Sequence, residues 1–270
     1  AGALAGLGLA VQPLRDLAGA WGRRRRYLAA RARCAALMAL SPLPPVRRKR
    51  GGAAKPTALA FDGVREGVLR GLDAAIAPGG RVAVAGPNGA GKTLLLALAA
   101  GLEVPERGRV RLDGRPAHRP GPATARPCLI GAHSPILAGT LRRALTMGAA
   151  SRPGLDDAAI EAAARRYGMD PVLRRLGGLD GCLGEGGRTL STGERQRLLL
   201  ARAALSGTGL MLLDKPDEGL DDAAPRLIAM LLAETSATVV MVTHRADVAA
   251  LADTQWHLER GKLRTPCPAS

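Results

Sequence analysis

Aromatic residues are almost missing from this chain, which has two Trp, two Tyr and one Phe among 270 residues. Proteins that hold nucleobases by stacking need exposed rings, so the composition argues against a base-stacking surface. Cysteine is scarce as well, because only four occur and no C-x-x-C pair is present. This spacing indicates neither a zinc site nor a disulfide framework, and it favours buried or incidental thiols in a reducing compartment. The four are Cys34, Cys128, Cys182 and Cys267.

The apolar stretch that opens the chain, residues 1–11, is short. A membrane-spanning helix needs about 20 apolar residues, so this stretch cannot span a bilayer by itself. Its basic residues follow the apolar run, which is the wrong order for a signal peptide. The stretch is similar to the end of a membrane helix whose following arginines lie on the cytoplasmic side. An amphipathic helix docked on the rest of the chain is the alternative.

Acidic residues are outnumbered, since 39 Lys and Arg face 23 Asp and Glu and the net charge is +16. Ten of these sixteen charges come from residues 1–50, where eleven Lys and Arg stand against Asp16 alone. Such an excess is compatible with nucleic acid, with an anionic membrane surface, or with an Arg-rich solvated face. Because the charge follows the apolar stretch and aromatic residues are scarce, we expect a membrane partner and no nucleic acid.

Short apolar runs alternate with helical stretches after a Pro- and Gly-containing linker, "SPLPPVRRKRGGAAKP" at residues 41–56. With 47% hydrophobic residues, the chain is long enough for one large core and an appendage. The order of elements predicts an α/β fold with a central sheet, flanking helices and a helical insertion. We expect strands at 57–61, 81–86, 109–114, 210–214 and 238–244, helices at 92–102, 153–176 and 194–204, and a closing hairpin at 255–264.

The segment "GPNGAGKT", from Gly86 to Thr93, has the pattern G-x-x-x-x-G-K-T between a predicted strand and a predicted helix. Its glycines allow backbone N–H groups to wrap phosphate oxygens, and the helix N-terminus adds a positive dipole end. We expect Lys92 to reach the β- and γ-phosphates and the Thr93 hydroxyl to bind Mg²⁺. The predicted ATP-binding loop consists of Gly86, Pro87, Asn88, Gly89, Ala90, Gly91, Lys92 and Thr93.

The octet "LSTGERQR", residues 190–197, is a second motif. Alone it predicts a capped helix start, with Ser191 as the N-cap and Glu194 three residues later. Between two nucleotide motifs it resembles the L-S-G-G-Q signature of the ATP-binding cassette (ABC) ATPases, with departures at Thr192 and Glu194. The resemblance implies that Ser191, Gly193 and Glu194 cover ATP bound by a second cassette. That cassette, identical or different, is the expected partner.

Further segments carry the same resemblance. The run "LMLLD" ends at Asp214, which matches the Walker B aspartate that holds Mg²⁺ in the family. "EGLD", residues 218–221, matches the loop at the dimer seam. A lone histidine at a strand end is more often structural, but the order and spacing of the motifs favour the match of His244 to the switch histidine, which contacts the γ-phosphate in the family. "GEGGRTLSTGE" contains Glu185 and is similar to the segment that precedes the signature in ABC exporters.

Three further positions depart from the family pattern. Lys215 stands where the family has the glutamate that activates water. A lysine side chain is protonated at neutral pH and cannot accept a proton. Lys215 is therefore expected to pair with the γ-phosphate and stabilise bound ATP. The alternative is neutral drift in a nonfunctional copy. The glutamine that follows the next strand is replaced, with His133 beside Ala132 as its stand-in. No aromatic residue occupies the adenine-stacking position near Gly63.

The resemblance implies a P-loop NTPase cassette over residues 58–266, with a helical subdomain at about 133–207. Residues 1–40 would form the end of the last transmembrane helix and a basic cytosolic helical extension, and 41–57 a linker. The chain is expected to be the nucleotide-binding domain of an ABC exporter half-transporter that hydrolyses ATP slowly at its own site. The transporter would lie in the inner or plasma membrane, with the cassette on the cytoplasmic side. A non-hydrolysing pseudo-ATPase clamp or regulatory subunit, and a soluble ABC protein outside transport, are the alternatives.

Overall fold

A computed structural model describes residues 55–119, 127–131, 134–149 and 155–264. All of them belong to one unit, Arg47–Ser270. The predicted membrane-helix end and basic extension at residues 1–40 lie outside the described residues, as do most of the predicted linker and His133. In the part of the chain that is described, no helix has both the length and the apolar character needed to cross a membrane.

A central sheet of six strands has the order β12-β11-β3-β10-β9-β6, in which only the hairpin partner β12 runs antiparallel to its neighbour. Strands β9 and β10 are buried on both faces, which explains why their sequences are continuous apolar runs rather than alternating patterns. The predicted α/β fold is therefore confirmed. The strands are β3 (Arg81–Ala85), β6 (Cys128–Ile130), β9 (Leu210–Asp214), β10 (Thr238–Val242), β11 (Thr254–Glu259) and β12 (Lys262–Arg264).

The two faces of this sheet belong to different cores. Leu212 and Val240 pack in one core with helix α2 (Lys92–Ala99) and a second sheet. Met211 and Met241, one position along, pack in the other core, which includes residues of helices α7 (Ala224–Glu234) and α8 (Ala246–Ala249). Successive side chains of a strand point to opposite faces, so one apolar run supplies both cores.

The second sheet is antiparallel, with the order β2-β1-β4-β5. Its β2 was not predicted from the sequence, because its buried residues Leu69, Leu72 and Ile76 are spaced like those of a helix. Gly71, with a φ of 72°, and a register shift in the neighbouring strand interrupt the regular alternation. The strands are β1 (Leu59–Glu66), β2 (Leu69–Ile76), β4 (Arg107–Leu112) and β5 (Arg115–Pro116).

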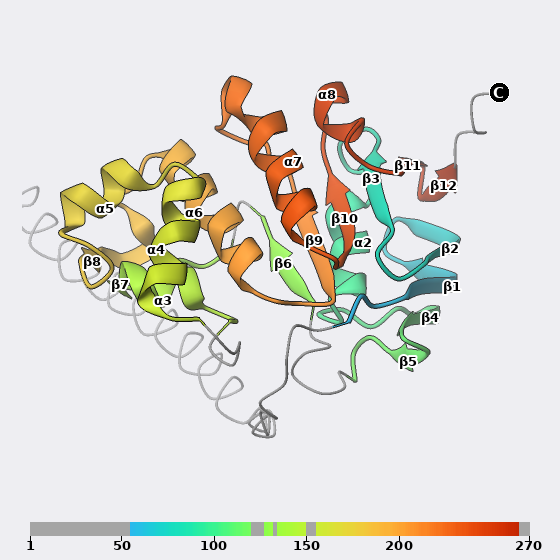
Figure 1. The fold of residues 1–270 in the computed structure, drawn as a ribbon. Helices are drawn as coiled ribbons and strands as arrows, with labels where there is room; N and C mark the ends of the chain where they lie inside the picture. The colour runs from blue at the N-terminus through green and yellow to red at the C-terminus, as the bar shows by residue number, and fades with distance from the viewer. Residues whose placement is uncertain (1–54, 120–126, 132–133, 150–154, 265–270) are drawn as a thin grey trace, which may run out of the picture. The chain divides into compact units, whose positions relative to one another are not determined.

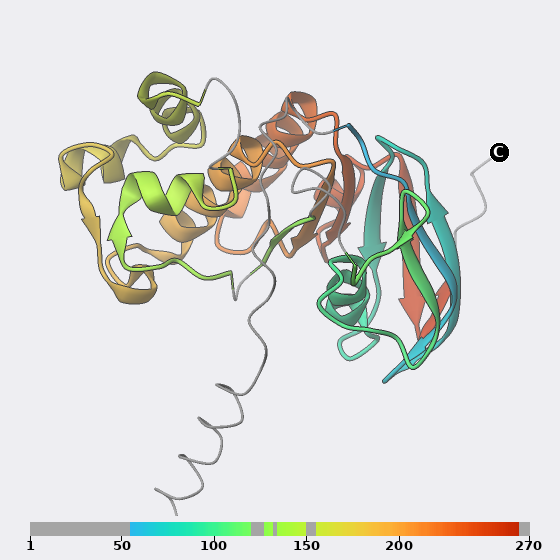
Figure 2. The same cartoon turned by 90° about the horizontal axis from the view of Figure 1, so that it is seen from below.

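Helices α3 to α6 lie between β6 and β9 in the chain and gather away from the antiparallel sheet (Figures 1 and 2). The single helix predicted at 153–176 is wrong, because two helices occur there with Gly168 between them at a φ of 75°. The helix predicted at 194–204 is confirmed. The elements are β7 (Gly139–Thr140), α3 (Leu141–Thr146), α4 (Asp157–Arg166), α5 (Asp170–Leu176), β8 (Cys182–Leu183) and α6 (Thr192–Leu205), with 3-10 turns at Glu185–Gly187 and, after β9, at Asp221–Ala223.

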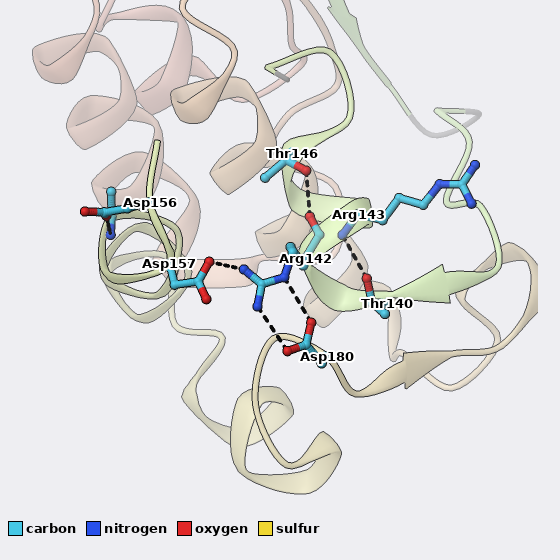
Figure 3. A network of polar contacts seen from close by, with 8 residues as sticks. Thr140, Arg142, Arg143, Thr146, Asp156, Asp157 and Asp180 are labelled. Carbon is cyan, nitrogen blue, oxygen red and sulfur yellow. Dashed lines mark hydrogen bonds and ion pairs between the residues drawn. The ribbon is translucent and has the colours of Figure 1, made fainter. Parts of the chain in front are cut away.

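Arg142 connects α3 to α4 and to the segment that precedes β8 (Figure 3). Its guanidinium pairs with Asp157 in the first turn of α4 and donates to both carboxylate oxygens of Asp180, before β8, at 3.0 and 3.1 Å. Both helices start at side-chain caps, since Thr140 accepts from the N–H of Arg143 and Asp156 from that of Ala159. Ion pairs and caps thus hold this helical region together alongside its apolar core.

Candidate nucleotide-binding site

Three neighbouring parallel strands end at one edge of the central sheet. Strand β10 lies between β3 and β9, and Val242 at its end is opposite both Val84 of β3 and Asp214 of β9. The loop after β3, the Asp214 carboxylate and the residues after β10 therefore share this edge. In open α/β sheets, ligands bind at the carboxyl ends of the strands.

The loop from Gly86 to Gly91 has a backbone that only glycine allows at several positions. Gly86 has a φ of 146°, and a Cβ atom there would lie 2.1 Å from the carbonyl oxygen of Leu258. Gly91 precedes α2 with a φ of 101° and gives the helix no side-chain cap, and the first turn of α2 contains no acidic residue. No side chain of the described residues therefore caps the first N–H groups of α2, which can take up an anion.

Lys92, the first residue of α2, closes over this loop. Its Nζ donates hydrogen bonds to the carbonyl oxygens of Gly86 at 2.7 Å and Pro87 at 2.9 Å, and the residue is only 7% exposed. Burial lowers the pKa of Lys92, the nearby cation of Lys215 lowers it further, and Asp214 opposes both. Among the described residues, no carboxylate pairs with the Lys92 ammonium, so incoming phosphate oxygens can replace the two carbonyls.

The next residue, Thr93, contacts the end of β9. Its hydroxyl donates a 2.8 Å hydrogen bond to Oδ2 of Asp214. The other oxygen of Asp214, Oδ1, is buried and has no hydrogen-bond partner among the described residues. Within the described residues, no group of three or more His, Cys, Asp or Glu side chains gathers anywhere. A hydroxyl beside an unsatisfied carboxylate oxygen fits Mg²⁺, which binds through one or two protein oxygens together with phosphates and water.

Lys215 follows Asp214 in a left-handed conformation, with a φ of 51°. Its N–H donates to the carbonyl of Val242 at 2.9 Å, and its side chain is exposed. Lys215 lies at the edge of the sheet that also carries the loop closed by Lys92, and its positive charge contributes to the lowered pKa of Lys92. The position directly after Asp214 therefore offers a cation to the site.

The loop after Lys215 is fixed from two sides. Gln196 of α6, which is buried, donates from Nε2 to the carbonyl oxygen of Pro216 at 2.9 Å. Thr243, after β10, donates from its hydroxyl to Asp217 at 2.9 Å, and the neighbouring His244 is exposed. Gln196 and Asp217 were not predicted from the sequence. Gln196 could have been found, because it is a polar residue one turn before Leu200 on the apolar, buried side of α6.

The signature segment forms the start of α6. Ser191 caps the helix and Glu194 bonds back to the Ser191 N–H, so the capping box predicted from this octet is confirmed. A Cβ on Gly193 would lie 2.9 Å from the carbonyl of Gly219, so the segment packs closely against the loop that follows β9. In the described part of the chain, no hydrogen bond joins Ser191, Gly193 or Glu194 to Lys92, Thr93 or Asp214.

The predicted base-stacking position offers no ring. Gly63 has a φ of 56°, and a Cβ there would meet nothing within 4 Å. Phe61, Tyr167 and Trp256, the aromatic residues of the described ranges, are all at most 4% exposed. No described aromatic side chain can therefore stack on a bound base.

The sequence model of the family described as "ABC transporter" matches residues 69–218. The chain is 34% identical over 241 residues to "Mycobactin import ATP-binding/permease protein IrtB" of Mycolicibacterium thermoresistibile, covering 86% of this chain and 41% of that protein. It is 37% identical over 181 residues to "Glutathione/L-cysteine transport system ATP-binding/permease protein CydC" of Escherichia coli K12, covering 66% and 31%. A solved structure of a bacterial Atm1-family ABC exporter with ATP bound has a TM-score of 0.70 and 27% identity, covering 88% of this chain and 43% of that one. The chain spans less than half of each.

Proposed function

The chain belongs to the ABC transporter family, whose cassettes bind ATP, and we propose that it is the nucleotide-binding domain of a longer exporter-type half-transporter. The observation that carries this proposal is the Thr93–Asp214 hydrogen bond next to the loop closed by Lys92. Two residues far apart in sequence meet there with the chemistry that a metal-bound triphosphate requires. The membrane domain would precede the cassette, with residues 1–40 as its last part, and the cassette would face the cytoplasm.

Binding of ATP uses groups that are already in place. Lys92 exchanges the carbonyls of Gly86 and Pro87 for oxygens of the β- and γ-phosphates, while the N–H groups of the loop and of the α2 N-terminus surround the phosphates. Thr93 and Asp214 would hold Mg²⁺, which neutralises phosphate charge when bound. His244, exposed at the same edge, is the proposed contact to the γ-phosphate.

Hydrolysis at this site is proposed to be slow because of Lys215. A water that attacks the γ-phosphate needs a base to take its proton. A lysine ammonium has no lone pair with which to take that proton, and its positive charge attracts the phosphate instead. The cassette would therefore keep ATP bound, while Ser191, Gly193 and Glu194 complete the site of a second cassette, identical or different. A partner with an intact base would supply the turnover that drives export.

A second candidate function follows from the same lysine. A cassette that binds ATP without hydrolysing it can act as a nucleotide-dependent clamp or regulatory subunit. Lys215, which follows Asp214 at the same edge of the sheet as the loop closed by Lys92, favours this role, because an ammonium attracts a triphosphate without supplying a base. ATP hydrolysis by the full assembly distinguishes the two functions, because a clamp should hydrolyse no ATP at the site of either cassette.

The test is a titration of the full-length protein with a fluorescent ATP analogue in the presence of Mg²⁺. Lys92→Ala removes the cation that faces the β- and γ-phosphates, so its affinity should fall by at least about tenfold. Lys262→Ala, which removes an exposed lysine of β12, is the matched control and should bind as the wild type does. Equal affinities for Lys92→Ala and the wild type would exclude residues 86–93 as the phosphate site.

A further inference from the structure

Arg175, in the last turn of α5, holds the carboxylate of Glu194 with two nitrogens. Nη1 lies 2.8 Å from Oε1 and Nη2 lies 3.2 Å from Oε2. The same Nη2 also donates to the carbonyl oxygen of Thr189 at 3.2 Å, just before the signature segment. Two parallel N–H···O bonds fix a carboxylate in orientation as well as in charge.

The carboxylate held in this way is also half of the capping box of α6. Its Oε2 accepts from the N–H of Ser191 at 2.8 Å, and the Ser191 hydroxyl accepts from the N–H of Glu194 at 3.2 Å. Both oxygens of Glu194 are therefore engaged, one by Arg175 alone and one by Arg175 together with the Ser191 N–H. Within the described ranges, neither the N–H of Thr192 nor that of Gly193 donates a hydrogen bond, so the capping box leaves both available to a ligand.

A carboxylate in the first turn of α6 has opposite effects on the helix and on a phosphate ligand. It stabilises the positive end of the helix dipole, but it repels a phosphate that approaches the same end. Pairing with Arg175 lowers the pKa of Glu194, so the carboxylate stays ionised and compensated by a neighbouring cation. The family signature has a neutral glutamine at this position and needs no such cation.

We propose that Arg175 is a positioning residue for the ATP site of the partner cassette. It neutralises Glu194 and turns its carboxylate back onto the capping box, so that the start of α6 presents N–H donors to phosphate. The inference rests on the proposed function, in which the signature segment covers ATP bound by a second cassette. It adds a residue of another helix, 19 positions before Glu194, to the set that determines ATP affinity there.

The test uses the full-length transporter with its partner cassette. The ATP concentration that gives half-maximal closure of the two cassettes is measured by energy transfer between dyes placed on them. Arg175→Gln leaves the Glu194 charge uncompensated, so this concentration should rise about tenfold or more. The double variant Arg175→Gln with Glu194→Gln should return close to the wild-type value, because glutamine completes a capping box without charge.

Arg166→Gln is the matched control. It removes an ion pair of 2.7 Å to Glu234 between α4 and α7, with side-chain exposures of 53% and 27% that resemble the 46% and 22% of the Arg175–Glu194 pair. It should not change the ATP concentration for closure. Thermal unfolding of all variants measures the loss of stability caused by removing the ion pair between α5 and α6. Arg175→Gln and the double variant both lack this ion pair, so they should lose the same stability.

Two results would overturn the inference while leaving the proposed function intact. One is a double variant as impaired as Arg175→Gln, which would make Arg175 a plain connection between α5 and α6. The other is an Arg175→Gln protein that closes at the wild-type ATP concentration. A wild-type assembly that does not respond to ATP at all would contradict the proposed function itself, and the inference with it.

Discussion

The hydroxyl of Thr93 donates a 2.8 Å hydrogen bond to the carboxylate of Asp214, across 121 positions of sequence. The first residue belongs to the helix after β3 and the second to the end of β9, and β10 lies between these two strands. Oδ1 of Asp214 is buried and has no partner within the described ranges, which is a cost that a bound cation removes. The proposed Mg²⁺ site follows from this one relationship.

Thr93→Ala should therefore weaken ATP binding only when Mg²⁺ is present. Loss of a hydroxyl that holds or orients the metal is expected to lower Mg²⁺-dependent affinity by about tenfold. Titrations with Mg²⁺ and with a chelator measure the effect, and Thr93→Ser, which keeps the hydroxyl, is the control. If the alanine variant shows the same dependence on Mg²⁺ as the wild type, Thr93 does not contribute to a metal site.

The absence of a ring at Gly63 predicts weak discrimination between bases. Stacking on an aromatic side chain contributes roughly 1–3 kcal/mol per base, and no described aromatic residue is exposed to provide it. ATP and GTP should therefore bind with affinities within about threefold of each other, if the triphosphate carries the affinity. Competition between the two nucleotides measures this ratio.

A variant tests whether the base lies near Gly63. Gly63→Tyr should strengthen ATP binding relative to Gly63→Ala, which carries the same left-handed backbone strain without a ring. A wild type that strongly prefers ATP would show that other groups select adenine. An identical affinity of the two variants would place the base elsewhere.

Membrane attachment is predicted from residues 1–11 and the arginines that follow. The natural full-length protein should stay with membranes through both high-salt and alkaline washes, because an embedded apolar helix resists treatments that release electrostatically bound proteins. A chain that starts at Thr57 should be recovered in the soluble fraction. Release of the full-length protein by salt would mean that the basic segment only adheres to the membrane surface.

The sequence predicted the parts of the fold that local patterns determine. The apolar runs of β9 and β10 and the glycines before Lys92 specify strands and a phosphate loop by composition alone. Long-range features were not predictable in this way. Gly168, at the break between α4 and α5, packs so closely against Arg197 that a Cβ atom on Gly168 would lie 2.5 Å from the Arg197 guanidinium. The local sequence gives no sign of this contact.

The same distinction between local patterns and long-range contacts applies to the candidate site. Motifs identified Lys92, Thr93 and Asp214, and strand order then brought them to one edge of the sheet. The Arg175 and Gln196 contacts were missed, because each depends on how α6 packs against a segment distant in sequence. The roles of the proposed site residues stay predictions.

Slow hydrolysis at this site is attributed above all to Lys215. Lys215→Glu restores a carboxylate next to Asp214, and a positioned base contributes roughly 10²–10⁴-fold to rate. The gain is expected toward the lower end, because Ala132 and His133 also depart from the family pattern. ATP affinity should stay equal or fall, since a cation that faces phosphate is removed. Lys215→Ala, which removes the cation without adding a base, is the control.

The direct measurement is single-turnover hydrolysis of Mg-ATP by the full-length assembly. If the partner is a different chain, its own P-loop lysine is replaced so that only the site of this chain reports. The account predicts a faster turnover for Lys215→Glu than for both the wild type and Lys215→Ala. An unchanged rate in Lys215→Glu with Mg-ATP still bound would contradict the claim that Lys215 silences the site.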